Sequence, residues 1–226
     1  MKDVNATVII DIKNKTEEDI WKSVEYSRRK NIGKAKRNGL YIEKTNSKED
    51  YEKCYNMYAQ TIRDGKSTPF SYEVWKKWAD EEKWDLFVIK KEKEKIGYFS
   101  VIKITRRYYG EDSDKIGIRP RVFASDKKYV DYRVNDLIYW GTILHGLKQG
   151  VDFVDLGGYQ IKPKGHLKGV NSFKEKWGGE VFKYYLDYPF YVAIARKLIR
   201  NIGILWHLNE FLKKFKQKPP KHFELT

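Results

Sequence analysis

Apolar and polar residues follow a helical pattern over the first part of the chain. Thr16 followed by Asp19 is typical of a capping box, and apolar residues then recur at helical spacing until Gly39 offers a stop. The pattern predicts a helical segment over 16–38 that is broken near Ser27. Lysine and arginine residues lie on both flanks of its apolar stripe, so the segment either presents a solvated basic face or contacts phosphates.

The pattern of the remaining chain predicts a mixture of strands and helices. Strands are expected at 40–44, 85–90, 96–105, 116–125, 151–155 and 181–186. Helices are expected from 47, over 71–82, from 134 up to Gly150, over 171–177 and from about 189. This order of elements predicts one mixed α/β domain over 1–187 and a basic helical appendage over 188–226, packed on or beside it.

The composition is typical of a globular protein with a sizeable core. Of the 226 residues, 41% are hydrophobic and 15% are aromatic, which is too much apolar material for a disordered chain. No run approaches the length of a membrane-spanning helix, and Asp3 and Asp11 lie where a signal peptide would need apolar residues. The one cysteine, Cys54, lies on the apolar face of the helix that starts at 47. We therefore expect a cytoplasmic protein in which Cys54 is a core thiol.

The net charge of +15, from 46 basic and 31 acidic residues, favours polyanionic partners such as RNA, anionic lipid or nucleotide-linked substrates. Charge of this kind indicates a partner and not a reaction. In the basic tail from Tyr188, apolar residues recur at helical spacing among lysines and arginines. The tail either packs on the domain with a solvated basic face or lies on an anionic membrane surface.

Signature motifs of several enzyme classes are missing from the sequence. It contains no phosphate-binding loop, dinucleotide-binding glycine motif, zinc-protease motif or nucleophile elbow. The four histidines lack the spacing of metal ligands, so we expect no metal. His145 lies on an apolar helix face and is expected to be a hydrogen-bonded core histidine. His166 lies in the polar loop 162–168 and is a candidate proton shuttle or substrate contact.

The most informative stretch joins residues 155–158, Asp-Leu-Gly-Gly, to residues 173–179, Phe-Lys-Glu-Lys-Trp-Gly-Gly. The pattern predicts a strand end with a glycine-rich exit, and a short helix that carries Lys174 back over that strand end. There Lys174 can stabilise the oxyanion of an acyl-transfer intermediate or bind a phosphate. The alternative is that Phe173 and Trp177 are core anchors and Lys174 is a solvated neighbour. Spacing alone favours this alternative.

Three blocks of sequence together resemble the FemABX-type aminoacyltransferases. The first is Trp21 with the basic run 28–39, Arg-Arg-Lys-Asn-Ile-Gly-Lys-Ala-Lys-Arg-Asn-Gly. The second is 135–140, Asn-Asp-Leu-Ile-Tyr-Trp, ahead of the helix that ends at Gly150. The third is 155–158 with Phe173-Lys174 and the glycine pair 178–179. The blocks span most of residues 7–186, and their order and separations carry the resemblance, since none is specific alone.

The resemblance implies a GNAT-like fold and a transfer reaction. Enzymes of this family move an amino acid from aminoacyl-tRNA to the peptide stem of a cell-wall precursor, so aminoacyl-tRNA and a nucleotide-linked or lipid-linked peptide are the implied partners. Lys174 with Phe173 matches the family's catalytic Phe-Lys pair, in which the lysine would stabilise the tetrahedral intermediate or the tRNA end. The residues that we expect to contact substrate are Arg29, Lys36, Asn135, Asp155, Gly157, Gly158 and His166.

The resemblance also argues against acetyl-CoA. An ordinary GNAT enzyme holds the pyrophosphate of CoA on the backbone N–H groups of a glycine-rich turn that opens a helix. The corresponding stretch here, 125–135, contains no glycine. We therefore expect no cofactor, with aminoacyl-tRNA as the donor substrate.

The chain departs from the family pattern in one respect, because Fem-type enzymes usually have two tandem GNAT-like halves and this sequence resembles the second half alone. A homodimer would complete the substrate site, or the acceptor is a different amine, or only binding is retained. The alternatives are an N-acyltransferase with another acyl donor or acceptor, and a non-catalytic module that binds RNA or an anionic surface. A lipid-linked acceptor would place the protein at the inner membrane surface.

Overall fold

A mixed sheet of seven strands runs through the molecule. The structure, a computed structural model, describes residues 2–65 and 67–187, so the predicted appendage over 188–226 lies outside the described residues. The strands are β1 (Lys2–Asp11), β2 (Leu40–Thr45), β3 (Asp85–Lys91), β4 (Glu94–Thr105), β5 (Ile116–Ser125), β6 (Phe153–Tyr159) and β7 (Glu180–Asp187). Their order is β2-β3-β4-β5-β6-β1-β7, and all neighbours are antiparallel except the parallel pair β5 and β6.

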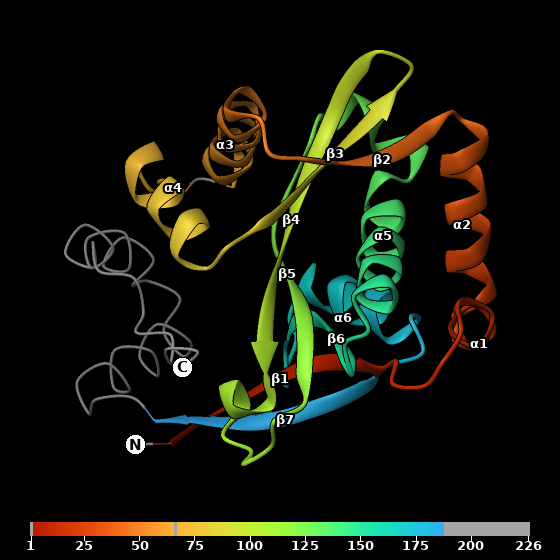
Figure 1. The fold of residues 1–226 in the computed structure, drawn as a ribbon, viewed down its shortest axis with the longest axis vertical. Coiled ribbons are helices and arrows are strands. Elements are labelled where there is room, and N and C mark those ends of the chain that lie inside the picture. Colours follow the sequence, from red (N-terminus) through yellow and green to blue (C-terminus); the bar gives the residue numbers. More distant parts are fainter. Residues whose placement is uncertain (1, 66, 188–226) are drawn as a thin grey trace.

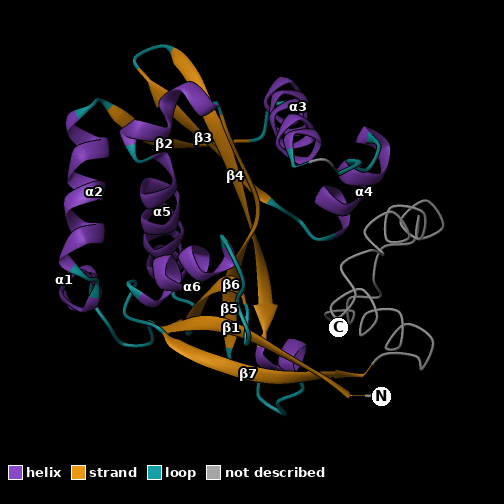
Figure 2. Cartoon of the chain, turned by 180° about the vertical axis from the view of Figure 1, so that it is seen from behind, coloured by secondary structure: helices purple, strands orange, loops and turns teal. Residues whose placement is uncertain are grey.

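Helices cover both faces of the sheet (Figure 1; Figure 2). They are α1 (Glu17–Ser23), α2 (Tyr26–Arg37), α3 (Lys48–Asp64), α4 (Tyr72–Glu81), α5 (Val134–Gln149) and α6 (Leu167–Glu175), with short 3-10 helices η1 (Arg106–Tyr109) and η2 (Lys127–Tyr132). In both views α3 and α4 lie on one face, and α1, α2, α5 and α6 lie on the other. Each layer buries its own hydrophobic cluster against the sheet, centred on Trp75 on one side and on Trp140 and Trp177 on the other.

The predicted helical segment over 16–38 is two helices. Thr16 and Asp19 form the expected capping box at the start of α1. The break lies at Val24 and Glu25, slightly before the predicted position, because Val24 is extended and buried and the backbone N–H of Glu25 donates to the carbonyl of Lys176. The chain therefore turns where it meets the segment that follows α6.

Strand β1 is missing from the sequence prediction. It is the strand next to one edge of the sheet, where it pairs with β6 on one side and with the edge strand β7 on the other. Apolar residues at alternate positions, Val4, Ala6, Val8 and Ile10, carry the signal for this strand. The residues from Ala6 to Ile10 are buried, as expected for a strand covered on both faces.

Several predicted features of the core are confirmed. Cys54 is fully buried, and burial raises the pKa of its thiol. Nε2 of the His145 ring donates a hydrogen bond to the Asp85 carboxylate at 2.9 Å, and burial lowers the pKa of the ring. Within the described part of the chain, none of the helices has the length and apolar character needed to cross a membrane.

Candidate functional site

The candidate site lies where β5 and β6 stop pairing. These parallel strands pair only at Gly117 with Phe153 and at Ile118 with Val154, although both strands continue beyond these residues. Further along, the carbonyl of Leu156 on β6 accepts a hydrogen bond from the Tyr139 hydroxyl of α5 at 3.4 Å. A helix side chain thus replaces the neighbouring strand as a partner of β6.

Both strands also carry an irregularity beyond this point. On β5 the register with β4 shifts between Ser100 and Val101, which leaves Arg121 as an extra residue. On β6 the register with β1 shifts between Thr7 and Ile9, which places two residues, Leu156 and Gly157, opposite Val8. Such β-bulges re-aim side chains and are over-represented next to active sites.

Gly157 forms the bulge of β6 and has a backbone φ of +82°, a conformation that glycine adopts without steric cost. The predicted strand end at Asp155 is wrong by several residues, since β6 runs on to Tyr159 and contains both glycines. The pairing partner β1, which the sequence prediction missed, extends β6 in this way. The glycines therefore bend the strand and do not terminate it.

Lys174 reaches this bulge from the last turn of α6. Its Nζ donates a hydrogen bond to the carbonyl of Gly158 at 2.7 Å and lies 3.5 Å from the place where a Cβ on Gly157 would be. The lysine is only 7% exposed, so the solvated position that spacing alone favours is wrong. Burial lowers the pKa of Lys174 to about 8, an effect that the charge of Asp155 partly opposes and the charge of Arg119 reinforces.

Phe173 of α6 and Trp177, just beyond the end of α6, pack toward the core, as the core-anchor interpretation predicts. The rings of Phe173 and Trp177 lie 5.1 and 5.5 Å from the ring of Tyr139. Trp177 is fully buried and Phe173 is half-buried. The two aromatic residues therefore fix α6 on α5, and the helix that they anchor carries Lys174 to β6.

The basic helix α2 contacts this region through Arg28. The guanidinium lies 4.9 Å from the centre of the Phe173 ring and forms a 2.9 Å ion pair with Asp136 of α5. Asp136 is buried, which raises the pKa of its carboxyl, whereas the charge of Arg28 opposes this change. The sequence prediction named Arg29 as a substrate contact and included Arg28 only as part of the basic run 28–39.

The other expected substrate contacts are dispersed. Arg29 is half-buried beside the ring of Tyr26, and Lys36 is exposed in the last turn of α2. Asn135 is exposed in the first turn of α5. His166 is exposed at the start of α6, at the opposite end of that helix from Lys174. The contacts of the expected residues of α6 and β6 join Lys174, Asp155, Gly157 and Gly158, and they include none of these four.

Asp155 is fully buried, and its carboxylate is surrounded by donors. Oδ1 accepts from the N–H of Gly157 at 2.7 Å and from the hydroxyl of Thr7. Oδ2 accepts from the hydroxyl of Tyr109 at 2.5 Å and lies 3.5 Å from Nε of Arg119. Burial and the adjacent carboxylate raise the pKa of Tyr109, so its hydroxyl remains a donor. Sequence reasoning found Asp155 and missed its partners, for which no motif gives a signal.

The start of α5 does not suit the pyrophosphate of CoA. The glycine-free stretch 125–135 forms η2 and the N-terminal cap of α5, which is Arg133. The buried carboxyl of Asp136 lies in the first turn of that helix, where the backbone amides would otherwise bind a phosphate. The Asp136 carboxylate would repel a pyrophosphate bound at these amides, so the residues present do not fit the cofactor.

Comparison with known proteins identifies the fold. No family model and no curated protein matches the sequence. Among solved structures, FemX gives a TM-score of 0.62 at 14% identity, over 87% of this chain and 63% of that chain. L-PGS from Bacillus licheniformis gives a TM-score of 0.56 at 14% identity, over 96% of this chain and 69% of that chain. A third similar structure is the C-terminal DUF2156 domain of a protein assigned as a lysylphosphatidylglycerol synthetase from Agrobacterium fabrum. It gives a TM-score of 0.53 at 11% identity, over 81% of this chain and 60% of that chain.

These likenesses confirm the predicted fold class, a single mixed α/β domain of GNAT-like architecture. The chain spans less than two thirds of the FemX and Agrobacterium fabrum chains. At such low identity the likeness shows the fold alone.

Proposed function

We propose that this chain is an aminoacyltransferase that moves an amino acid from aminoacyl-tRNA to an amine of a cell-wall peptide precursor. The observation that carries the proposal is the buried amine of Lys174, held on the Gly158 carbonyl beside the bulge of β6. Similarity of fold to FemX and the three sequence blocks support this reaction class over others that GNAT-like folds carry out. The net charge of +15 suits a donor with a long phosphate backbone.

In this proposal Lys174 supplies positive charge to an acyl-transfer step. The acceptor nitrogen attacks the carbonyl carbon of the aminoacyl ester, so a C–N bond forms and the ester C–O bond to the tRNA ribose breaks. The amine proton passes through water to the departing ribose oxygen. Negative charge on the tetrahedral intermediate is stabilised by the Lys174 ammonium, whose pKa of about 8 leaves it mostly protonated at neutral pH.

A lipid acceptor is the second candidate. Two of the similar structures carry the name L-PGS or lysylphosphatidylglycerol synthetase, and the product in that name is an amino-acid ester of a lipid hydroxyl. The same donor and the same Lys174 would serve this reaction, with a hydroxyl in place of an amine as the attacking group. The two candidates therefore differ only in the acceptor.

The test is transfer of labelled amino acid from total aminoacyl-tRNA, comparing the wild type with Lys174→Met. Acceptors are nucleotide-linked and lipid-linked muropeptide precursors in one set, and vesicles of phosphatidylglycerol in the other. Transfer to a muropeptide that is lost in the variant supports the proposal, whereas transfer to phosphatidylglycerol alone selects the lipid acceptor. Full activity of the variant contradicts the role of Lys174, and tRNA binding without any transfer favours a binding module.

A further inference from the structure

The Asp155 carboxylate binds the backbone N–H of the bulge residue, and the Thr7 hydroxyl lies between this carboxylate and the carbonyl of the same residue. Oδ1 accepts from the N–H of Gly157 at 2.7 Å. The Thr7 hydroxyl donates to the same oxygen, and Thr7 Oγ1 lies 2.9 Å from the carbonyl oxygen of Gly157. Tyr109 and Arg119 hold the other carboxylate oxygen. The conformation of Gly157 is thereby fixed from β1, β5, η1 and β6 together.

The next residue along the strand carries the Lys174 contact. Gly158 is exposed and has no side chain, so no side-chain packing of its own orients its carbonyl. The direction of that carbonyl follows from the bulge at Gly157, and the carbonyl accepts the hydrogen bond from Lys174 at 2.7 Å. A continuous chain of bonded groups thus runs from the carboxylate to the amine.

We infer that Asp155 is a positioning residue, whose carboxylate fixes the bulge at Gly157 and so sets where the Lys174 amine is held. A substrate contact was expected at this position, but full burial and occupied carboxylate oxygens assign it this indirect role instead. The inference rests on the proposed function only for the part that Lys174 plays in transfer.

Charge gives the network a second effect on the same amine. Asp155 faces Lys174 from β6 and raises its pKa, whereas Arg119 faces it from β5 and lowers it. Burial dominates over both and brings the pKa down to about 8. Removing the charge of Asp155 should therefore lower the pKa of Lys174 further, and removing the charge of Arg119 should raise it.

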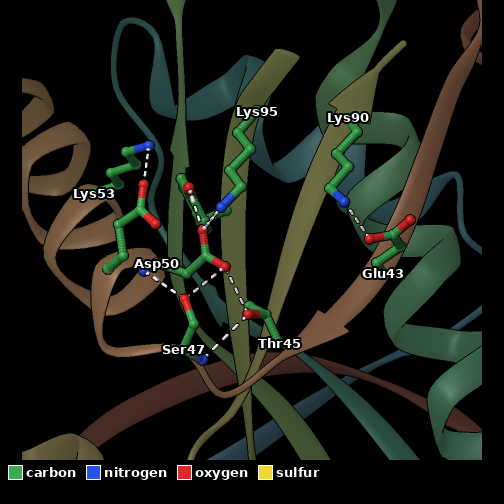
Figure 3. A network of polar contacts seen from close by, with 9 residues as sticks. Glu43, Thr45, Ser47, Asp50, Lys53, Lys90 and Lys95 are labelled. Carbon is green, nitrogen blue, oxygen red and sulfur yellow. Dashed lines mark hydrogen bonds and ion pairs between the residues drawn. The ribbon is translucent and has the colours of Figure 1, made fainter. Parts of the chain in front are cut away.

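A matched control lies at the far edge of the sheet (Figure 3). Asp50 of α3 is also buried, and its carboxylate accepts hydrogen bonds from Thr45, Ser47, Lys95 and Tyr98. Asp50→Asn and Asp155→Asn therefore make the same chemical change in two densely bonded, buried carboxylates. Only Asp155 faces Lys174.

The first experiment titrates Lys174 directly by NMR of protein labelled with ¹³C at the lysine Cε, with the resonance assigned by its absence in Lys174→Met. We expect a midpoint near pH 8 in the wild type, lower by about one pH unit in Asp155→Asn and higher in Arg119→Gln. Asp50→Asn should leave the midpoint unchanged. An unchanged midpoint in Asp155→Asn overturns the inference. This measurement needs no substrate, so it stands even when no transfer is found and the proposed function fails.

The second experiment uses Thr7, in case Asp155→Asn does not fold. Thr7→Val removes the hydroxyl that bridges Asp155 and Gly157 and nearly conserves volume, whereas Thr7→Ser keeps it. We expect Thr7→Val to lower kcat of transfer roughly 10- to 100-fold with KM unchanged. Thr7→Ser should keep the kcat of the wild type. Equal kcat for the two variants would show that the bridge does not position the amine, and would overturn the inference.

Discussion

The burial of Lys174 predicts that removing its amine makes the protein more stable. In the unfolded chain a lysine has a pKa near 10.5, whereas burial lowers the pKa of Lys174 to about 8 in the fold. At neutral pH the amine is protonated in both states, so the fold carries the full cost of a charge that its surroundings disfavour. At about 1.4 kcal/mol for each pKa unit, this cost is roughly 3 kcal/mol.

Lys174→Met removes this cost and fills a similar volume. The hydrogen bond to Gly158 is lost, but that residue is exposed and its carbonyl can bind water instead. We therefore expect Lys174→Met to raise the free energy of unfolding at pH 7 by roughly 3 kcal/mol, or Tm by roughly 6–12 °C for a chain of this size. Lys168→Met, at an exposed lysine of the same helix, should change the free energy of unfolding by less than about 0.5 kcal/mol.

The pH dependence of the free energy of unfolding separately tests whether Lys174→Met stabilises the protein. Between pH 8 and 10.5 the unfolded chain binds a proton at this site that the folded chain has lost, so the wild type gains stability as pH rises through this interval. The advantage of Lys174→Met is therefore full below pH 8 and vanishes by about pH 10.5. Urea unfolding of both variants from pH 6 to 10 measures it. A variant that is less stable than the wild type at pH 7, or an advantage independent of pH, would refute the reasoning.

Three further outcomes are expected. Gly157→Ala should cost about 1–2 kcal/mol in urea unfolding, since φ is +82° there, whereas Gly158→Ala has open space around it and should cost almost nothing. Arg28→Met should cost about 3 kcal/mol because it leaves Asp136 buried without its ion pair, and adding Asp136→Leu should recover most of this loss. In transfer assays corrected for ester hydrolysis, the ratio of kcat/KM of the wild type to that of Lys174→Met should fall above about pH 8 as Lys174 loses its charge, and a ratio independent of pH would contradict the cationic role.

The sequence predicts the elements of this fold well where local signals are strong. The capping box at Thr16, the core thiol at Cys54 and the histidine at His145 each depend on neighbours within a few turns or on a plain apolar face, and all are confirmed. Strand β1 shows a recognisable alternation but pairs only with β6 and β7, at the other end of the chain. Its absence from the prediction shortened β6 and put Gly157 in a loop.

The chemistry of the candidate site could be predicted only in part for the same reason. Lys174 and Phe173 stand out by resemblance, but the burial of Lys174 depends on a register shift between β1 and β6 that no local pattern encodes. Tyr109 and Arg119 reach Asp155 from segments distant in sequence, so spacing gives no signal for either residue.

Two buried charges in this protein show why burial alone does not indicate function. At Asp50 burial would raise the pKa of the carboxyl, but hydrogen bonds, led by the one from Lys95, outweigh burial and hold the pKa well below its ordinary value. The fold thus stabilises that charge, as expected for a structural network. At Lys174 the balance is reversed, since burial outweighs the attraction of Asp155 and disfavours the charged amine. An uncharged side chain would be the more stable choice there, so stability does not account for a lysine at this position.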